Sequence, residues 1–68
     1  MKIKWEKNEL EQWVHDNWKI CKERFITGDP LYRLYYKGSR YSPTGLKKDI
    51  VFSGSLYDVK KIVERIVD

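Results

Sequence analysis

The sequence has few of the residues that hold small folds together covalently. It contains one cysteine, Cys21, so no disulfide can form within the chain. No apolar run approaches the roughly 20 residues that cross a bilayer, and the first residues lack the apolar stretch of a signal peptide. We therefore expect a cytoplasmic protein that is stabilised by packing alone and has no contact with membranes.

Motifs of catalysis and cofactor binding are also missing. The four glycines are isolated, whereas a phosphate-cradling loop needs several close together. His15 has no other ligand-type residue at a suitable spacing, and a metal site needs three or four converging ligands. The acidic residues are dispersed, as on solvated faces. In a chain of 68 residues, these absences favour a non-enzymatic protein with no cofactor, no metal and no small-molecule substrate.

Aromatic residues, by contrast, are abundant. Three Trp, five Tyr and two Phe make up 15% of the chain. A domain of this length buries only roughly 60% of the surface that its unfolded chain exposes, and each aromatic ring can cover about 150 to 250 Å². We expect most of these rings to build the core of a single domain that spans residues 1–68.

The first part of the chain favours a strand followed by a helix. Ile3 and Trp5 alternate with lysines, which is the pattern of a short half-buried strand. Asn8, with Glu11 three residues later, has the pattern of a helix capping box. The apolar residues that follow fall on one face at helical spacing, namely Leu10, Trp13, Val14, Ile20 and Cys21, with Trp18 at its flank and Phe25 near its end.

This pattern predicts an amphipathic helix that ends at Gly28-Asp29-Pro30, because glycine suits the residue after a helix and proline cannot continue one. Asn17 would lie near the middle of the apolar stripe. It would need a hydrogen-bond partner there, since an unsatisfied buried amide costs about 1 to 3 kcal/mol.

The second half predicts two strands and a helix. Residues 31–37 and 48–52 are rich in strand formers and should pair antiparallel. The connection 38–47 includes a turn at Ser42-Pro43-Thr44-Gly45 and has room for a short extra strand around residues 40–42. Ser55 and Asp58 then cap an amphipathic helix. The predicted fold class is α+β, with a small antiparallel sheet packed on two amphipathic helices in the order (β)αββα.

Positive charge is concentrated in one block. The formal net charge is +4, and residues 31–48 contain five cations and no acidic residue. If Leu34 and Tyr36 face the helices, then Arg33, Tyr35 and Lys37 line the solvated face of the first strand. The same alternation places Ile50 and Phe52 of the second strand in the core, with Asp49 and Val51 on the solvated face. Lys47 falls on the solvated face too, and three more candidate residues stand at the loop end, namely Arg40, Tyr41 and Lys48.

A basic ribbon that carries tyrosines is typical of single-stranded nucleic-acid binding, because cations follow phosphates and rings stack on bases. The candidate site residues are therefore Arg33, Tyr35, Lys37, Arg40, Tyr41, Lys47 and Lys48, with Tyr35 or Tyr41 stacking. The alternative function is a protein-binding inhibitor or modulator that meets an acidic surface. The same cations could also merely solvate an exposed strand, with Tyr35 packed against Val51. Self-association as a homodimer, through a strand edge or the flank of Trp13 and Trp18, is compatible with either function.

The C-terminal half resembles a module of small phage and prophage proteins. That module has two strands followed by Ser-Leu at the start of an amphipathic helix, which correspond here to residues 35–38, 50–52 and 55–60. The resemblance covers residues 31–68, and segment 38–47 departs from the module's tight hairpin. It implies an origin in a mobile element, a host-cell cytoplasmic location and an accessory role, and it identifies no functional residues.

Overall fold

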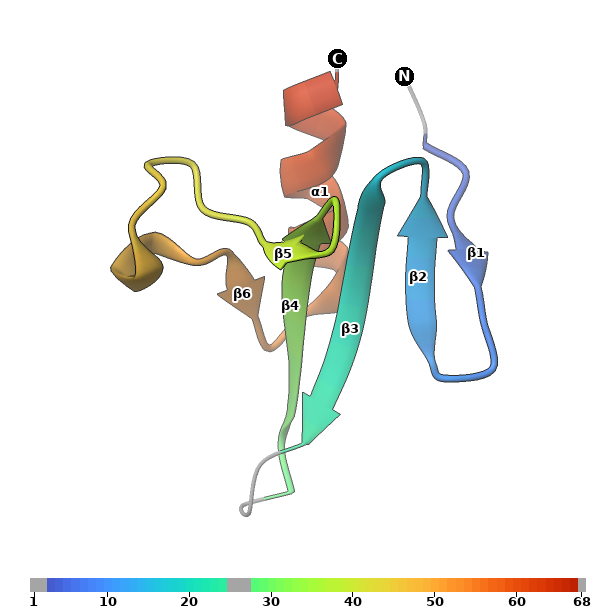
Figure 1. Ribbon diagram of the computed structural model, residues 1–68. Helices are drawn as coiled ribbons and strands as arrows, with labels where there is room; N and C mark the ends of the chain where they lie inside the picture. The colour runs from blue at the N-terminus through green and yellow to red at the C-terminus, as the bar shows by residue number, and fades with distance from the viewer. Residues whose placement is uncertain (1–2, 25–27, 68) are drawn as a thin grey trace.

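Short turns fold most of the chain into one antiparallel sheet. The computed structural model describes residues 3–24 and 28–67. In these residues six strands are followed by one α-helix (Figure 1). The strands are β1 (Glu6–Lys7), β2 (Gln12–His15), β3 (Trp18–Arg24), β4 (Pro30–Tyr36), β5 (Ser39–Arg40) and β6 (Phe52–Ser53). A 3-10 helix, η1 (Lys47–Asp49), precedes β6, and α1 (Leu56–Val67) ends the described chain.

The strand order is β1-β2-β3-β4-β5, and β6 pairs with the first half of β4 while β5 pairs with its end. The longest pairing, between β3 and β4, sets Ile20 opposite Leu34. β2 pairs with the other edge of β3 and sets Trp13 opposite Ile20. Since opposite residues share a face of the sheet, these three apolar side chains form a row across its centre.

Two turns meet at one end of the sheet. Asp16 and Asn17 join β2 to β3, with Asp16 at φ +55°. Lys37 and Gly38 join β4 to β5 at φ +52° and +84°, the signs that a type I′ turn requires. The Lys37 amide donates to the Asn17 carbonyl (2.9 Å), so the two turns lie side by side.

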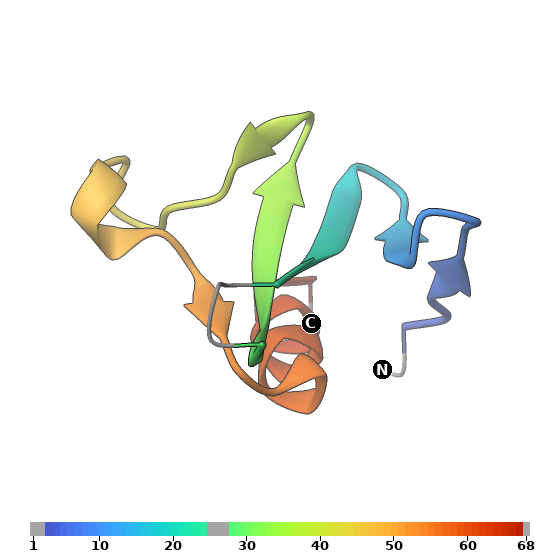
Figure 2. The same cartoon turned by 90° about the horizontal axis from the view of Figure 1, so that it is seen from below.

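α1 covers one face of the sheet. It lies against β4, and no other α-helix of the described residues covers the opposite face (Figures 1 and 2). Val59 and Val63 of the helix are fully buried, as are Ile20 and Leu34 of the sheet. Trp18, 6% exposed, extends this core, and the Tyr36 and Tyr41 rings pack on it at 4.5 and 5.0 Å between centroids. This cluster is the hydrophobic core of the domain.

The predicted C-terminal helix is confirmed, but its start differs in detail. The helix begins directly after Ser55. The hydroxyl of Ser53 makes the connecting hydrogen bonds: it accepts from the Ser55 amide (3.1 Å) and donates to the Asp58 carboxylate (3.3 Å). Strand residue Ser53 therefore ties the end of the sheet to the first turn of α1.

The predicted fold, with two helices on a small sheet, is wrong. The segment predicted as the first helix forms the β2–β3 hairpin, and the described structure is mostly sheet with one α-helix. Asn17, which a helix would have buried, is exposed in the turn. Asn8 does cap backbone amides, but they are those of Leu10 (2.9 Å) and Gln12 (3.0 Å) in the β1–β2 loop. Phe25, expected near the end of that helix, lies outside the described residues.

The prediction for the second strand is also wrong in its register. Only Phe52 and Ser53 pair as a strand, and Phe52 lies opposite Arg33, so it belongs to the face that α1 leaves uncovered and is 56% exposed. Val51, expected on the solvated face, packs against the core instead. A shift of one residue exchanges the two faces of a strand, and this shift accounts for both errors. Ile3 and Trp5 also pack on the core, though as extended chain before β1.

The core predicts a sharp contrast between two leucines. Leu34→Ala should lower the free energy of unfolding by about 2 to 5 kcal/mol, because it removes fully buried methyl groups and leaves a cavity. Leu46→Ala, at a position 52% exposed, should change it by less than about 0.5 kcal/mol. Urea denaturation followed by tryptophan fluorescence measures both. Equal effects of the two substitutions would contradict the described core.

Candidate nucleic-acid interface

The face of the sheet opposite α1 carries polar and aromatic side chains. We call it the open face. The pairing registers assign to it residues of six strands, namely Glu6, Gln12, Val14, Lys19, Cys21, Glu23, Leu31, Arg33, Tyr35, Arg40 and Phe52. Cations on this face outnumber acidic residues, and two aromatic rings lie among them.

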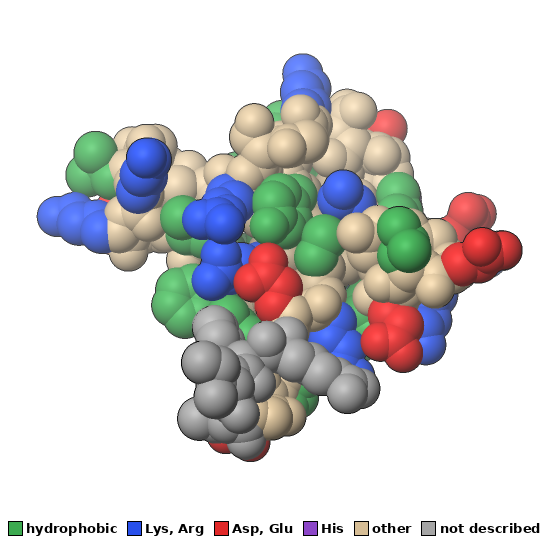
Figure 3. All heavy atoms as spheres, turned by 60° about the horizontal axis from the view of Figure 1, so that its bottom comes forward, with side chains coloured by type: hydrophobic (Ala, Val, Ile, Leu, Met, Phe, Trp, Pro, Cys, Tyr) green, Lys and Arg blue, Asp and Glu red, His purple; other side chains and the backbone are tan. Residues whose placement is uncertain are grey.

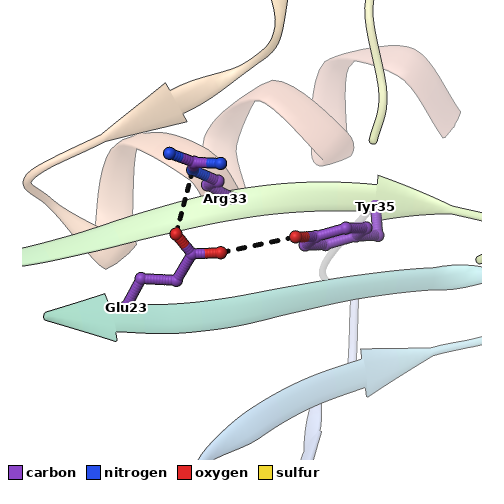
Figure 4. Close-up of polar contacts among 3 residues, drawn as sticks. All are labelled: Glu23, Arg33 and Tyr35. Carbon is purple, nitrogen blue, oxygen red and sulfur yellow. Dashed lines mark hydrogen bonds and ion pairs between the residues drawn. The ribbon is translucent and has the colours of Figure 1, made fainter. Parts of the chain in front are cut away.

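Glu23 connects two of these side chains (Figure 4). The hydroxyl of Tyr35 donates to Glu23 Oε1 at 3.4 Å. Nε of Arg33 lies 3.1 Å from Glu23 Oε2, but its N–H is not aligned with that oxygen, so the contact is an ion pair without a hydrogen bond. The side chains of Arg33 and Glu23 are 22% and 34% exposed. At that exposure the pair contributes no more than about 1 kcal/mol to stability.

The Tyr35 ring lies along the strands. Tyr35 is paired with Lys19 of β3, and Glu23 stands four residues after Lys19 on the same strand. The Tyr35 hydroxyl reaches the Glu23 carboxylate only because both side chains lean toward each other over the sheet (Figure 4). The Lys19 Nζ lies 5.6 Å from the ring centroid, at cation–π distance. The ring is thus held by a cation and by a carboxylate.

A hollow adjoins the open face at the β5 end. It has a volume of about 540 Å³ and is lined by Tyr35, Gly38, Ser39, Arg40, Ser42, Gly45, Leu46, Lys47 and Ile50. Its far wall is the projecting loop 41–50 (Figure 1), which Ser42 stabilises by donating to the Leu46 carbonyl (2.8 Å). Arg40 of β5 and Lys47 of η1 line the hollow together with Tyr35. It is large enough for a small ligand or one nucleotide.

Charge is distributed unevenly over this side of the molecule. Figure 3 shows Lys and Arg side chains on the lobe formed by loop 41–50, at the left, and on the neighbouring surface. Most of the visible Asp and Glu side chains lie at the opposite edge, toward β1 and β2. The basic end is therefore also the end with the hollow.

The structure brings together four of the seven predicted site residues. Arg33, Tyr35 and Arg40 share the open face, and Lys47 joins Tyr35 and Arg40 around the hollow. The other three lie apart. Lys37 is in the turn, with its Nζ 5.5 Å from the Tyr36 ring on the helix-covered face. Tyr41 is half-buried against Trp18, which leaves it unsuited to stacking on a base, and Lys48 does not line the hollow.

Sequence reasoning missed Lys19, Glu23 and Phe52. Lys19 and Glu23 were assigned to a helix, although Trp18, Lys19 and Ile20 alternate as a half-buried strand requires. Phe52 was assigned to the core. The alternation of residues 18–20 was the available signal for Lys19, whereas Cys21 and Lys22 break it before Glu23, and no local signal marks the register of Phe52.

Other classes of site find no support in the part of the chain that is described. Its His, Cys, Asp and Glu side chains form no group of three that could hold a metal ion. None of its helices combines the length and the apolar character needed to cross a membrane. Comparison of the chain with known protein families, with curated proteins and with solved structures finds no match.

Cys21 gives the open face a chemical probe. It lies between Gln12 and Arg33 in the pairing registers. Burial raises the pKa of the Cys21 thiol, with the nearby charge of Lys19 acting in the opposite direction. The native thiol therefore holds its proton to a higher pH than the same thiol in the unfolded chain.

This pKa shift predicts slow alkylation of the native protein. Because the thiolate is the reactive form, the rate of reaction of Cys21 with iodoacetamide should rise with pH along a curve whose midpoint lies above that of the urea-unfolded chain. Mass spectrometry of timed samples gives both curves. Superimposed midpoints would show that the thiol is as well solvated in the fold as outside it.

Proposed function

We propose that the protein is a non-enzymatic module that binds single-stranded nucleic acid on its open face. The observation that carries this proposal is the Tyr35 ring, which lies along the uncovered face, while Tyr35 lines a hollow together with Arg40 and Lys47. A base stacked on an aromatic ring contributes about 1 to 3 kcal/mol. The exposed Phe52 offers a second ring on the same face.

The cations take the phosphates in this proposal. Lys19 lies over the Tyr35 ring, and Arg40 and Lys47 line the hollow together with Tyr35. When a base stacks on Tyr35, the amine of Lys19 leaves its contact with the ring and contacts a phosphate instead. Arg33 is engaged by Glu23 and serves mainly to hold that carboxylate.

The open face favours a single strand over a duplex. Stacking requires a base whose faces are accessible, and the bases of a duplex are stacked on one another. α1, the one α-helix of the described chain, packs on the other face of the sheet, so it is not available to enter a major groove from the open face. Binding should therefore be stronger for an unpaired oligonucleotide than for a duplex of the same length.

The double substitution Arg40→Ala/Lys47→Ala tests the basic hollow. Fluorescence anisotropy with labelled single-stranded oligonucleotides should show weaker binding. The plot of log affinity against log salt concentration should also become less steep by about 1.4, because each of the two lost phosphate contacts contributes about 0.7 to its slope. The matched control is Lys61→Ala/Arg65→Ala, which removes the same charges from exposed positions on α1.

The control separates a local site from general attraction. If both double variants lose affinity equally, net charge alone drives binding and the open face is not the site. If the unmodified protein binds no single-stranded DNA or RNA at about 50 mM salt, where electrostatic binding is strong, the proposed function is wrong.

Cys21 supplies an independent test of the location. A strand that lies over the open face should cover the thiol, because Cys21 stands two residues along β3 from Lys19, on the same face. Saturating oligonucleotide should therefore slow its alkylation. An unchanged rate at saturation would place the strand elsewhere on the protein.

A protein partner with an acidic surface is the second candidate. The exposed Leu46 and Phe52, 52% and 56% exposed, favour it because apolar side chains among cations are typical of protein interfaces. A nuclease-treated pull-down from a host lysate distinguishes the two functions. A stoichiometric partner that survives nuclease and is lost in Phe52→Ala supports this candidate. An origin in a phage or other mobile element, a cytoplasmic location and homodimer formation remain predictions from the sequence.

A further inference from the structure

Glu23 places a carboxylate on a face that otherwise attracts anions. Its side chain is 34% exposed, and it lies next to the ring on which we expect a base to stack. A carboxylate repels phosphates, so its position beside Tyr35 needs a different explanation from that of the surrounding cations.

The two oxygens of Glu23 are each held by one neighbour. The Tyr35 hydroxyl contacts Oε1, and Arg33 Nε lies beside Oε2 (Figure 4). An ionised carboxylate has about four lone-pair sites, two on each oxygen. One contact on each side therefore fixes the orientation of the carboxylate and leaves each oxygen able to accept a further hydrogen bond.

The edge of a stacked base would meet this carboxylate. The Tyr35 ring points its hydroxyl at Glu23, so a base that covers the ring extends toward the same oxygens. Among the four common bases, guanine alone presents two adjacent donors, N1–H and the 2-amino group, that match two carboxylate oxygens. Adenine and cytosine present one amine beside an acceptor nitrogen, and uracil or thymine presents one N–H between two carbonyl oxygens.

We propose that Glu23 selects guanine in the strand bound on the open face, by accepting its N1–H and 2-amino hydrogens. This inference rests on the proposed function, since it assigns a base to the stacking position of Tyr35. Arg33 and Tyr35 are positioning residues that hold the carboxylate. Bidentate contact with a base is a strong discriminator, and about tenfold preference over the other bases is expected.

Single-base substitution in an oligonucleotide tests the preference. The probes are oligodeoxythymidines of about ten nucleotides, a length that small single-strand binders cover, with dG, dA, dC or deoxyinosine at the central position. Fluorescence anisotropy should give about tenfold tighter binding for the dG probe than for the unsubstituted one. Deoxyinosine lacks the 2-amino group and should lose most of this gain.

Glu23→Gln provides the matching change in the protein. An amide offers one acceptor in place of two, so the preference for dG should largely disappear. Affinity for the unsubstituted probe should stay equal or rise, because a negative charge is lost from the face. Glu64→Gln on α1 removes the same charge from the helix and should leave the preference for dG intact. Circular dichroism confirms that each variant is folded.

The outcomes separate this inference from the function beneath it. If the probes bind equally well, or if dA gains as much as dG, the open face is a non-selective platform, and the selection of guanine is wrong while the proposed function stands. The same holds if Glu23→Gln keeps the full dG preference. If no probe binds at all, both proposals fail.

Discussion

The packing of Val59 and Val63 against Ile20 and Leu34 is the contact on which the rest of the structure depends. These four side chains are fully buried, and they join the last element of the chain to the two central strands. Because the domain has a single α-helix in its described part, that helix can cover only one face of the sheet. The open face and its polar side chains follow directly from that shortage of covering elements.

The C-terminal half of the fold was predictable because its signals are local. Residues 56–67 repeat apolar side chains at helical spacing after a capping serine, and the strand formers of residues 31–37 form β4 almost as expected. The segment 8–24 was not, since Trp13, Val14, Ile20 and Cys21 satisfy a helical stripe, whereas strand pairing places Trp13 and Ile20 on one face of the sheet and Val14 and Cys21 on the other. The Asp16–Asn17 turn decides between these patterns, and its effect depends on tertiary pairing with β4.

The candidate site was predictable in part for the same reason. Arg33, Tyr35 and Arg40 belong to strands that the sequence marks clearly, so their shared face could be inferred from alternation. Lys19 and Glu23 reach that face only through the pairing of β3 with β4. Their positions depend on residues distant in the sequence, and so does the register that turns Phe52 outward. Residue type indicated the chemistry of the candidate site, whereas long-range contacts decided which residues belong to it.

Loop 41–50 is fixed at its two ends by hydrogen bonds that do not involve the residues in its interior. The Val51 amide donates to the Tyr41 carbonyl (3.0 Å), and both residues hydrogen-bond to the backbone of Leu34, so the two ends of the loop are fastened to the core and to each other. Inside these ends, Ser42, Thr44 and Asp49 hydrogen-bond within the loop. The ends of the loop are thus fixed independently of its interior. Substitutions inside the loop can therefore change the shape of the hollow while the backbone hydrogen bonds that fix Tyr41 and Val51 to Leu34 stay in place.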